Sequence, residues 1–308
     1  MTSSEVERLA ADLGARLGRP VATNVSLARC TTWRIGGPAD LVVAPRSMAE
    51  VRTCLDWARS RGLEVTALGA GSNVLVPDGG IRGLVLRTVP GLKHIEVGED
   101  SLRLGAGTLL ARALRRAARL GWRGLEFAAG IPGTVGGAVL MNAGTREGSV
   151  GSRVREVSLI DGRGELRRLK AGEMVFSYRS SSLPRDGLVV EVVLALEPGE
   201  EPAALERQIR ERLEARRRTQ PQGPSAGSVF KNPRQGPPAG WLIEQVGAKG
   251  LRRGGAMVAL EHANFIINTG GARAEDVLWL IAEVRRRVKD RFGIDLEPEV
   301  LVLGETRG

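Results

Sequence analysis

The sequence predicts an α+β fold with two domains. Its 308 residues are too many for one ordinary hydrophobic core and enough for two. Short apolar strands and amphipathic helices follow one another without the regular strand–helix alternation of a doubly wound sheet. The polar, turn-rich segment Glu197–Pro202 marks the expected boundary, which gives a first domain over 1–200 and a second over 201–308.

Helices are indicated by apolar residues that recur every three or four positions. The N-terminal helix has Ser4 and Glu7 at the spacing of a capping box, and the next helix has Ser47 and Glu50. A third helix is predicted near Leu109–Leu120 and ends at a glycine, a typical C-terminal cap. Three more are predicted near Ala203–Arg218, Trp241–Val246 and Val277–Phe292.

Strands are indicated by short apolar runs between turn residues. These runs are Leu41–Ala44, Val65–Leu68, Leu84–Arg87, Leu102–Leu104, Val157–Ile160, Leu188–Leu196, Phe265–Ile267 and Val300–Leu303. Many of the 41 glycines cluster at the ends of these runs, where tight turns or close backbone approaches are expected.

Composition narrows the possible function classes. The net charge is +10, and arginine runs at 216–218 and 285–287 could serve nucleic-acid binding. However, both runs lie in helical patterns without interleaved aromatic residues, so solvated helix faces are the favoured interpretation. A positive field also attracts an anionic small molecule such as a dinucleotide.

Targeting and redox signals are few. No window approaches eighteen consecutive apolar residues, so we expect no membrane insertion. The N-terminus contains several acids and resembles neither a signal peptide nor a transit peptide. We therefore expect a cytoplasmic protein in which Cys30 and Cys54 are reduced and buried. His94 and His262 are the only histidines, which excludes a His-rich metal site, and we predict no metal.

Two glycine-rich loops dominate the first half of the chain. In Gly69–Val76, two glycines followed by Ser72 and Asn73 offer backbone N–H groups that can cradle a pyrophosphate. The loop is not a Walker motif, because no Gly-Lys-Ser/Thr follows it. It is also a poor Rossmann fingerprint, because Val74 stands where the third glycine would be and an apolar, strand-like stretch follows. The second loop is Gly130–Ala138. Either loop alone is compatible with tight turns, but both together favour a large cofactor held mostly by backbone.

Three segments carry candidate reactive side chains. Phe176–Ser180 contains Tyr178, the only tyrosine, followed by Arg179; Gly227–Pro233 contains Ser228; and Leu296–Val300 contains Glu299. Taken singly, Arg179 is more readily interpreted as a surface arginine, Ser228 as a turn residue and Glu299 as a solvated strand end.

In this order, the segments closely resemble the MurB family, the UDP-N-acetylenolpyruvoylglucosamine reductases of peptidoglycan synthesis. The resemblance runs from about Thr31 to Gly304 and also includes Thr32–Gly37 and His262–Ile266. It implies an FAD-binding region of the vanillyl-alcohol-oxidase (PCMH) type, with two lobes divided near residue 95, and then a C-terminal α/β substrate domain.

The resemblance also implies a reaction. NADPH passes hydride to non-covalently bound FAD, which then reduces the enolpyruvyl double bond of UDP-N-acetylglucosamine enolpyruvate to give UDP-N-acetylmuramate. No nucleic acid and no obligate protein partner is implied.

The implied roles fall on matching positions in three groups. Arg179, Ser228 and Glu299 are catalytic, with Arg179 holding the carboxylate, Ser228 donating the proton and Glu299 stabilising the enolate. Asn232, Lys249 and His262 bind the sugar nucleotide. The implied FAD-binding residues are Arg34, Gly69, Gly71, Ser72, Asn73, Gly133, Thr134, Gly137 and Tyr178.

Two departures from the family pattern affect the expectations. Leu183–Gly187 leads directly into a strand, without the insertion and second tyrosine of longer members, which indicates the shorter type II form. A family lysine before the Gly-Ser motif is absent, and Arg217 or Arg218 lies nearby.

Two alternatives stay open. One is another flavin oxidoreductase of the same fold, such as an alcohol or lactone oxidase. Those enzymes often tether flavin through histidine or cysteine, and neither residue occurs in the glycine loops. The other is a non-catalytic protein that binds nucleotide sugars or nucleic acid, which would be colourless when purified.

Overall fold

The computed structural model describes residues 1–304 and groups them into two compact units. Unit 1 comprises Met1–Thr23, Asp40–Ala70 and Arg82–Ala215. Unit 2 comprises Asn24–Ala39, Gly71–Ile81 and the chain from Arg216 onward. Two short N-terminal segments thus group with the C-terminal part of the chain, a feature that the sequence division into 1–200 and 201–308 does not contain. That division stays a prediction.

The predicted helices are confirmed to within a few residues at their ends. The structure has α1 (Ser3–Leu17), α2 (Met48–Arg59), α3 (Leu110–Arg119), α4 (Val135–Leu140), α5 (Pro202–Thr219), α6 (Ala239–Gln245) and α7 (Ala274–Phe292). Only α4 was not predicted. Across the described residues, none of these helices has the length and apolar character that a membrane crossing requires.

The sequence predicted the N-terminal cap of α2 correctly and that of α1 incorrectly. The prediction of Ser4 as the first cap is wrong, because the Thr2 side chain accepts the hydrogen bond from the Glu5 N–H at 3.2 Å. The prediction of Ser47 is confirmed, since its Oγ accepts from the Glu50 N–H at 3.2 Å. Both caps are hydroxyl residues, so the sequence predicted the right type of residue for both helices and the wrong position for α1.

Each predicted strand overlaps a strand of the structure. The larger strands are β1 (Ala22–Ser26), β2 (Pro38–Val43), β3 (Val65–Leu68), β5 (Ile81–Arg87), β6 (Ile95–Val97), β7 (Ser101–Gly105), β10 (Val154–Ile160), β11 (Leu166–Lys170), β14 (Leu188–Ala195), β16 (Ala256–Val258) and β17 (Ile266–Asn268). The two-residue strands are β4 (Val74–Leu75), β8 (Gly144–Thr145), β9 (Gly148–Ser149), β12 (Phe176–Ser177), β13 (Ser180–Ser181), β15 (Arg252–Arg253) and β18 (Leu301–Val302).

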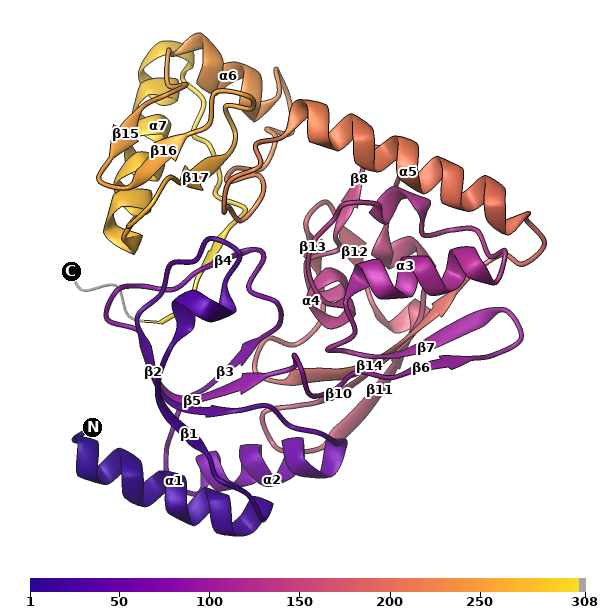
Figure 1. Ribbon diagram of the computed structural model, residues 1–308, viewed down its shortest axis with the longest axis vertical. Helices are drawn as coiled ribbons and strands as arrows, with labels where there is room; N and C mark the ends of the chain where they lie inside the picture. The colour runs from indigo at the N-terminus through magenta and orange to yellow at the C-terminus, as the bar shows by residue number, and fades with distance from the viewer. Residues whose placement is uncertain (305–308) are drawn as a thin grey trace. The chain divides into compact units, whose positions relative to one another are not determined.

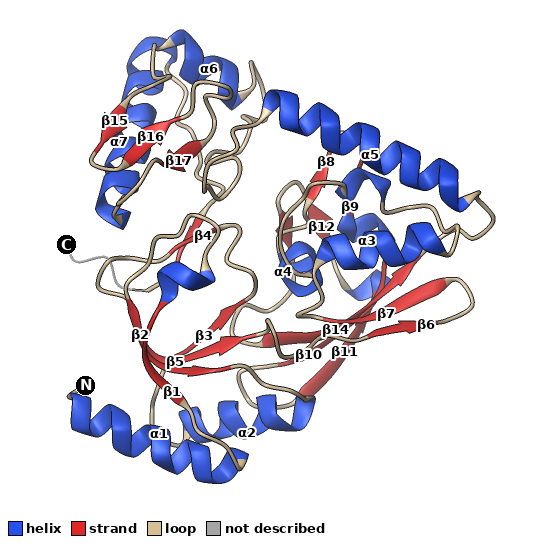
Figure 2. Ribbon diagram, in the orientation of Figure 1, coloured by secondary structure: helices blue, strands red, loops and turns tan. Residues whose placement is uncertain are grey.

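Two sheets organise unit 1. The four-stranded sheet has the order β1-β2-β5-β3, and the five-stranded antiparallel sheet has the order β11-β10-β14-β7-β6. The strands β1, β6 and β11 were not predicted, and all three are edge strands. They are half-exposed or exposed along their length, so they contain no apolar run that a sequence pattern could reveal. Figure 2 shows α1 and α2 together on one face of the four-stranded sheet.

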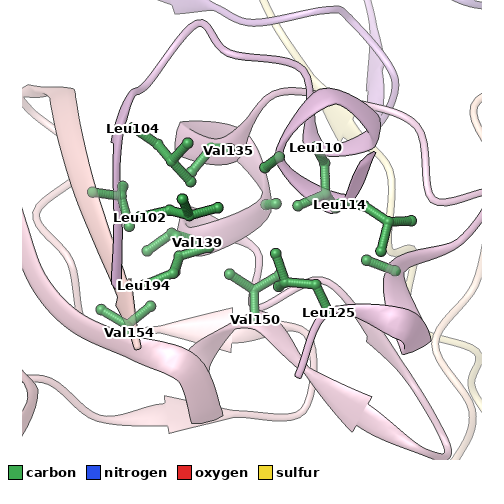
Figure 3. Packing of buried hydrophobic residues seen from close by; sticks show 14 of the residues in the cluster. Leu102, Leu104, Leu110, Leu114, Leu125, Val135, Val139, Val150, Val154 and Leu194 are labelled. Carbon is green, nitrogen blue, oxygen red and sulfur yellow. The ribbon is translucent and has the colours of Figure 1, made fainter. Parts of the chain in front are cut away.

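The main core of unit 1 lies between the five-stranded sheet and the helices α3 and α4 (Figure 3). The sheet contributes Leu102, Leu104, Val154 and Leu194, and the helices contribute Leu110, Leu114, Val135 and Val139. Each such side chain stabilises the fold by roughly 1.5–3 kcal/mol relative to an exposed one. The core therefore fixes α4, and with it the second glycine loop, against the sheet.

Unit 2 has its own core, built around α6, α7 and the three-stranded sheet β15-β16-β17 (Figure 1). The N-terminal segment joins it through Trp33, which is fully buried and whose indole Nε1–H donates to the Ile266 carbonyl at 2.7 Å. The Asn268 side chain returns a hydrogen bond to the Trp33 carbonyl at 3.0 Å. These contacts explain why residues 24–39 group with the C-terminal chain.

Both cysteines are free and buried, which confirms their predicted state. Burial raises the pKa of the Cys54 thiol to about 12. A thiol with so high a pKa is protonated and unreactive at neutral pH, so Cys54 acts as a small apolar residue of the core.

Candidate functional site

The two glycine loops meet within unit 1. Gly69 follows β3 directly, and a Cβ added to it would lie 2.8 Å from the Thr134 Oγ1. Thr134 itself caps α4, with its hydroxyl accepting from the Gly137 N–H at 3.2 Å. The sequence suggested two separate loops, and the structure brings Gly69 and Thr134 into contact.

The second loop is partly helical, which corrects the expectation of an irregular loop throughout. Glycines at 136 and 137 lower the helix propensity, but α4 still begins at Val135 because Thr134 caps it. Gly136 packs on the protein itself: its Cβ position lies 2.8 Å from the Ala106 Cβ, and its N–H donates to the Ala106 carbonyl at 2.9 Å. Gly137 is exposed, and only the Thr134 hydroxyl lies near its Cβ position, at 3.4 Å. A flat cofactor can therefore approach the backbone at Gly137.

Gly71 permits a close approach to the protein's own backbone. It has a φ of +65°, and a Cβ there would lie 2.1 Å from the Cys30 carbonyl oxygen. The Thr32 N–H donates to the Gly71 carbonyl at 3.0 Å. The absence of a side chain at Gly71 is therefore needed for this approach of Cys30, and a cofactor contact of the Gly71 backbone stays a prediction. The neighbouring Arg34 is exposed, with a φ of +56°.

Asn73 connects the first loop to the strand that carries Glu299. Its side-chain N–H₂ donates to the Glu299 carbonyl at 3.0 Å, and its own carbonyl accepts from the Leu301 N–H at 3.0 Å. The parallel pairing of β4 with β18 continues this contact. One donor of the amide is thus committed to positioning Glu299, in addition to the cofactor role that the sequence predicts.

Ser228 and Glu299 lie on neighbouring segments of unit 2. The Glu299 N–H donates to the Val229 carbonyl at 2.7 Å, and the Val229 N–H donates to the Asn264 carbonyl at 2.8 Å. Isolated bridges pair Ser228 with Phe265 and Phe230 with Pro298. We call these three hydrogen-bonded segments, 228–231, 264–265 and 297–299, the catalytic ladder, after the catalytic roles that the sequence predicts for Ser228 and Glu299. Both side chains are half-buried, so they can meet a ligand while their backbones stay fixed.

Asn264 holds the middle of the catalytic ladder, and the sequence analysis missed it. Only 4% of its surface is exposed. Its side-chain carbonyl accepts from the Phe230 N–H at 2.9 Å, and its amide donates to the Phe230 carbonyl at 2.8 Å. The sequence signal that could have revealed Asn264 is its position among apolar residues. An asparagine buried in such a run needs hydrogen-bond partners for both its carbonyl and its N–H₂ group.

The three predicted sugar-nucleotide residues also lie in unit 2. The His262 Nδ1 accepts from the Asn264 N–H at 3.2 Å, so its Nε2 carries the proton of the neutral ring. Burial lowers the pKa of His262, and the charge of Lys249 lowers it further. Lys249 pairs with Glu244 at 2.7 Å, and the Asn232 side chain accepts from the Ala239 N–H at 3.0 Å, where α6 begins. The site thus presents a neutral N–H donor beside a cation.

Arg179 belongs to unit 1, on the two-residue turn between β12 and β13. The pairs Phe176–Ser181 and Ser177–Ser180 close this hairpin. Arg179 has a φ of +55°, a left-handed conformation that usually favours glycine at this turn position. Tyr178 is 54% exposed, and the guanidinium carbon lies 5.1 Å from its ring centroid. An exposed tyrosine beside an arginine offers one flat surface and one planar anion-binding fork.

The hairpin is attached to the end of α4. The Asn142 amide donates to the Ser177 carbonyl at 2.7 Å, and its side-chain oxygen accepts from the Gly151 N–H at 2.9 Å. The Ser181 hydroxyl donates to the Leu140 carbonyl at 2.7 Å. Residues 182–187 then lead directly to β14, in keeping with the short form that the sequence indicates.

Family models match two parts of the chain. Residues 39–170 match an FAD-binding domain, and residues 219–303 match the C-terminal domain of UDP-N-acetylenolpyruvoylglucosamine reductase. These matches confirm the predicted fold class, an FAD-binding region followed by a substrate domain.

Individual relatives extend the similarity over nearly the whole chain. A UDP-N-acetylenolpyruvoylglucosamine reductase of Moorella thermoacetica is 53% identical over 98% of this chain and 99% of its own length. The enzyme of the same name from Nostoc punctiforme is 44% identical, over 94% of this chain and 87% of its own. The solved structure of the reductase MurB from Thermus caldophilus is 40% identical with a TM-score of 0.77, covering 92% of this chain and 98% of that one.

Proposed function

Because this chain belongs to the UDP-N-acetylenolpyruvoylglucosamine reductase family, we propose that it reduces UDP-N-acetylglucosamine enolpyruvate to UDP-N-acetylmuramate, a step of peptidoglycan precursor synthesis. The enzyme is a flavoprotein that uses non-covalently bound FAD, in keeping with the matched FAD-binding domain. When bound, FAD supplies the hydride that it has received from NADPH. The residues of this chain then have two tasks: to stabilise the negative charge that forms beside the substrate carboxylate, and to deliver a proton.

Arg179 and Glu299 stabilise the charge. The planar guanidinium of Arg179 holds the substrate carboxylate through two parallel N–H bonds and polarises it as the enolate forms. The carboxyl group of Glu299 donates a hydrogen bond to the enolate in its protonated form. Such preorganised donors act where charge develops and need no rearrangement during the reaction.

Ser228 delivers the proton. Hydride adds to the terminal carbon of the double bond, and the carbon beside the carboxylate then takes a proton from the Ser228 hydroxyl. A serine hydroxyl is a weak acid, so this transfer requires the strong base that the developing carbanion provides. The catalytic ladder supports this role, because it fixes the backbone of Ser228 on both sides.

The sugar nucleotide is bound by Asn232, Lys249 and His262. Lys249 neutralises phosphate charge, and the His262 Nε2–H donates to a substrate oxygen because its Nδ1 is occupied by the Asn264 N–H. Arg34, Gly69, Gly71, Ser72, Asn73, Gly133, Thr134, Gly137 and Tyr178 form the FAD site of the proposal. The substrates NADPH and a nucleotide sugar favour a cytoplasmic location, without an obligate protein partner.

One observation supports the mechanism most directly: the Glu299 N–H donates to the carbonyl of Val229, the residue that follows Ser228. The test is anaerobic. The purified protein should be yellow, NADPH should bleach it, and the enolpyruvyl nucleotide sugar should restore the oxidised spectrum. Flavin that acid or heat cannot release from the polypeptide would contradict non-covalent binding, and a reduced flavin that this substrate fails to reoxidise would contradict the reaction.

A further inference from the structure

Thr88 lies where the first glycine loop leaves the sheet. The strands β3 and β5 run parallel, with Leu68 paired to Arg87, and both end at this point. The Thr88 N–H donates to the Leu68 carbonyl at 3.0 Å, and Gly69 follows Leu68 in the chain. Ligands of open sheets bind beyond the carboxyl ends of parallel strands. Thr88 therefore occupies a position where ligand contact is expected.

Two polar side-chain atoms of consecutive residues at this point are buried and lack a protein partner. They are the Thr88 Oγ1 and the Arg87 Nε, and no residue among 1–304 accepts from or donates to either of them. Thr88 is only 5% exposed. Buried hydroxyl and guanidinium groups nearly always have a hydrogen-bond partner, because their removal from water is otherwise uncompensated.

Other buried threonines show that this protein normally satisfies its hydroxyls. The Thr31 hydroxyl donates to the Ile35 carbonyl at 2.8 Å, the Thr108 hydroxyl donates to the His94 carbonyl at 3.0 Å, and the Thr134 hydroxyl accepts from the Gly137 N–H. Thr108 is close by, since the Cβ position of its neighbour Gly107 lies 1.9 Å from the Thr88 carbonyl oxygen. Thr88 and Thr108 therefore lie close together in the fold, and only the hydroxyl of Thr108 has a protein partner.

We propose that Thr88 and Arg87 are cofactor-binding residues that donate hydrogen bonds to the ADP portion of FAD. A guanidinium N–H can only donate, and a threonine hydroxyl donates as readily, so the pair suits the acceptor-rich phosphate and ribose oxygens. The inference takes the identity of the cofactor from the proposed function, and it assigns two residues to FAD that the sequence did not.

The test compares Thr88→Val with Thr108→Val in protein stripped of flavin. Valine matches threonine in shape and lacks the hydroxyl. Thr88→Val removes an unsatisfied group, so the thermal midpoint of the flavin-free protein should stay or rise, whereas Thr108→Val breaks a bond and should lower it. Titration with FAD should then show a Kd about tenfold higher for Thr88→Val, the effect of one hydrogen bond to a charged ligand. Thr88→Ser, which keeps the hydroxyl, should restore affinity.

Titration with ADP and with FMN locates the contact. Thr88→Val should weaken ADP binding by the same factor as FAD binding and leave FMN binding unchanged. An unchanged FAD affinity in Thr88→Val would overturn the inference. The proposed function would stand in that case, because the parent protein would still bind FAD. A loss for FMN but not ADP would overturn the assignment to the ADP portion. Parent protein that binds no FAD would instead refute the proposed function.

Discussion

The catalytic ladder of unit 2 and the Arg179 hairpin of unit 1 position their candidate reactive side chains by different means. Ser228 and Glu299 are fixed by hydrogen bonds between segments that lie far apart in the sequence, with Asn264 between them. Arg179 is fixed locally, by a two-residue turn in which its own backbone is left-handed. The ladder depends on the folded domain, whereas the hairpin stores strain in the reactive residue itself. Substitution of Asn264 in the ladder should therefore lower the stability of the protein, whereas substitution of Arg179 by glycine should raise it.

The largest effect is expected for Ser228→Ala. The variant should fold, bind FAD and be bleached by NADPH at nearly the parent rate, because flavin reduction creates no substrate carbanion. Reoxidation by the enolpyruvyl sugar should slow by roughly 10²–10⁴, the usual contribution of a positioned general acid. Rapid-mixing measurements of each half-reaction separate the two steps, and Ser228→Cys should recover part of the rate. Equal slowing of both steps would show that Ser228 positions ligands instead of donating the proton.

Arg179→Gly should lose activity and gain stability. Removal of the guanidinium should slow reoxidation by roughly 10²–10³, as for other groups that stabilise a developing oxyanion. Glycine adopts a φ of +55° without strain, so the free energy of unfolding should rise by about 1 kcal/mol. Urea denaturation of parent and variant checks the second effect. A matched control is Arg185→Gly, at an exposed arginine of the same unit with no positive φ, which should not stabilise the protein. If Arg179→Gly is destabilising, the hairpin does not store strain.

Asn264→Ala should weaken the ladder and lower the stability of the protein. The substitution leaves the buried N–H and carbonyl of Phe230 without partners, which should cost about 2–4 kcal/mol of folding free energy. Asn264→Asp keeps the acceptor and loses the donor, so its stability should be intermediate near neutral pH. Denaturant melts give the order of the three proteins. A stable Asn264→Ala variant with normal reoxidation would mean that backbone pairing alone holds Ser228.

The smallest expected effect is on the pH dependence of stability, through His262, which accepts a hydrogen bond from Asn264 of the ladder. Burial lowers the pKa of His262 in the folded protein, so below the ordinary value of 6.5 the unfolded chain binds a proton more readily. Its contribution to stability is therefore fully present above that value and declines as the pH falls toward the folded pKa. Melts of the parent and His262→Gln between roughly pH 7.5 and 5 should differ in slope. Identical slopes would show that His262 does not titrate differently on folding.

Sequence patterns predicted what depends on local periodicity. The buried strand β14 was recognisable as an apolar run, and α7 was recognisable because its apolar residues recur every three or four positions. The edge strand β11 was missed because it is exposed along most of its length and contains no apolar run. The helix α4 was missed because its glycines hide a helix that the Thr134 cap and tertiary packing support.

Such patterns contain no information on which distant segments of the chain pair with one another. Nothing in the spacing of Asn73 indicates that its amide contacts the backbone of Glu299, and nothing near Gly71 indicates the approach of Cys30. The candidate reactive residues were predicted through a family resemblance, since a serine after a glycine has no distinguishing local signal. Asn264 could have been suspected from its apolar neighbours, but its partner could not.

The pairing of β4 with β18 has a consequence for how the chain is made. Val74 and Leu75 emerge during synthesis long before Leu301 and Val302. The glycine-loop segment must therefore wait for all the residues between the two strands before it finds its hydrogen-bond partner, and such non-local closure slows folding. During that interval an apolar strand is left with an open edge, which makes the nascent chain vulnerable to aggregation. Deletion of the residues from Leu301 onward should accordingly harm the N-terminal half of the molecule as much as the C-terminal end.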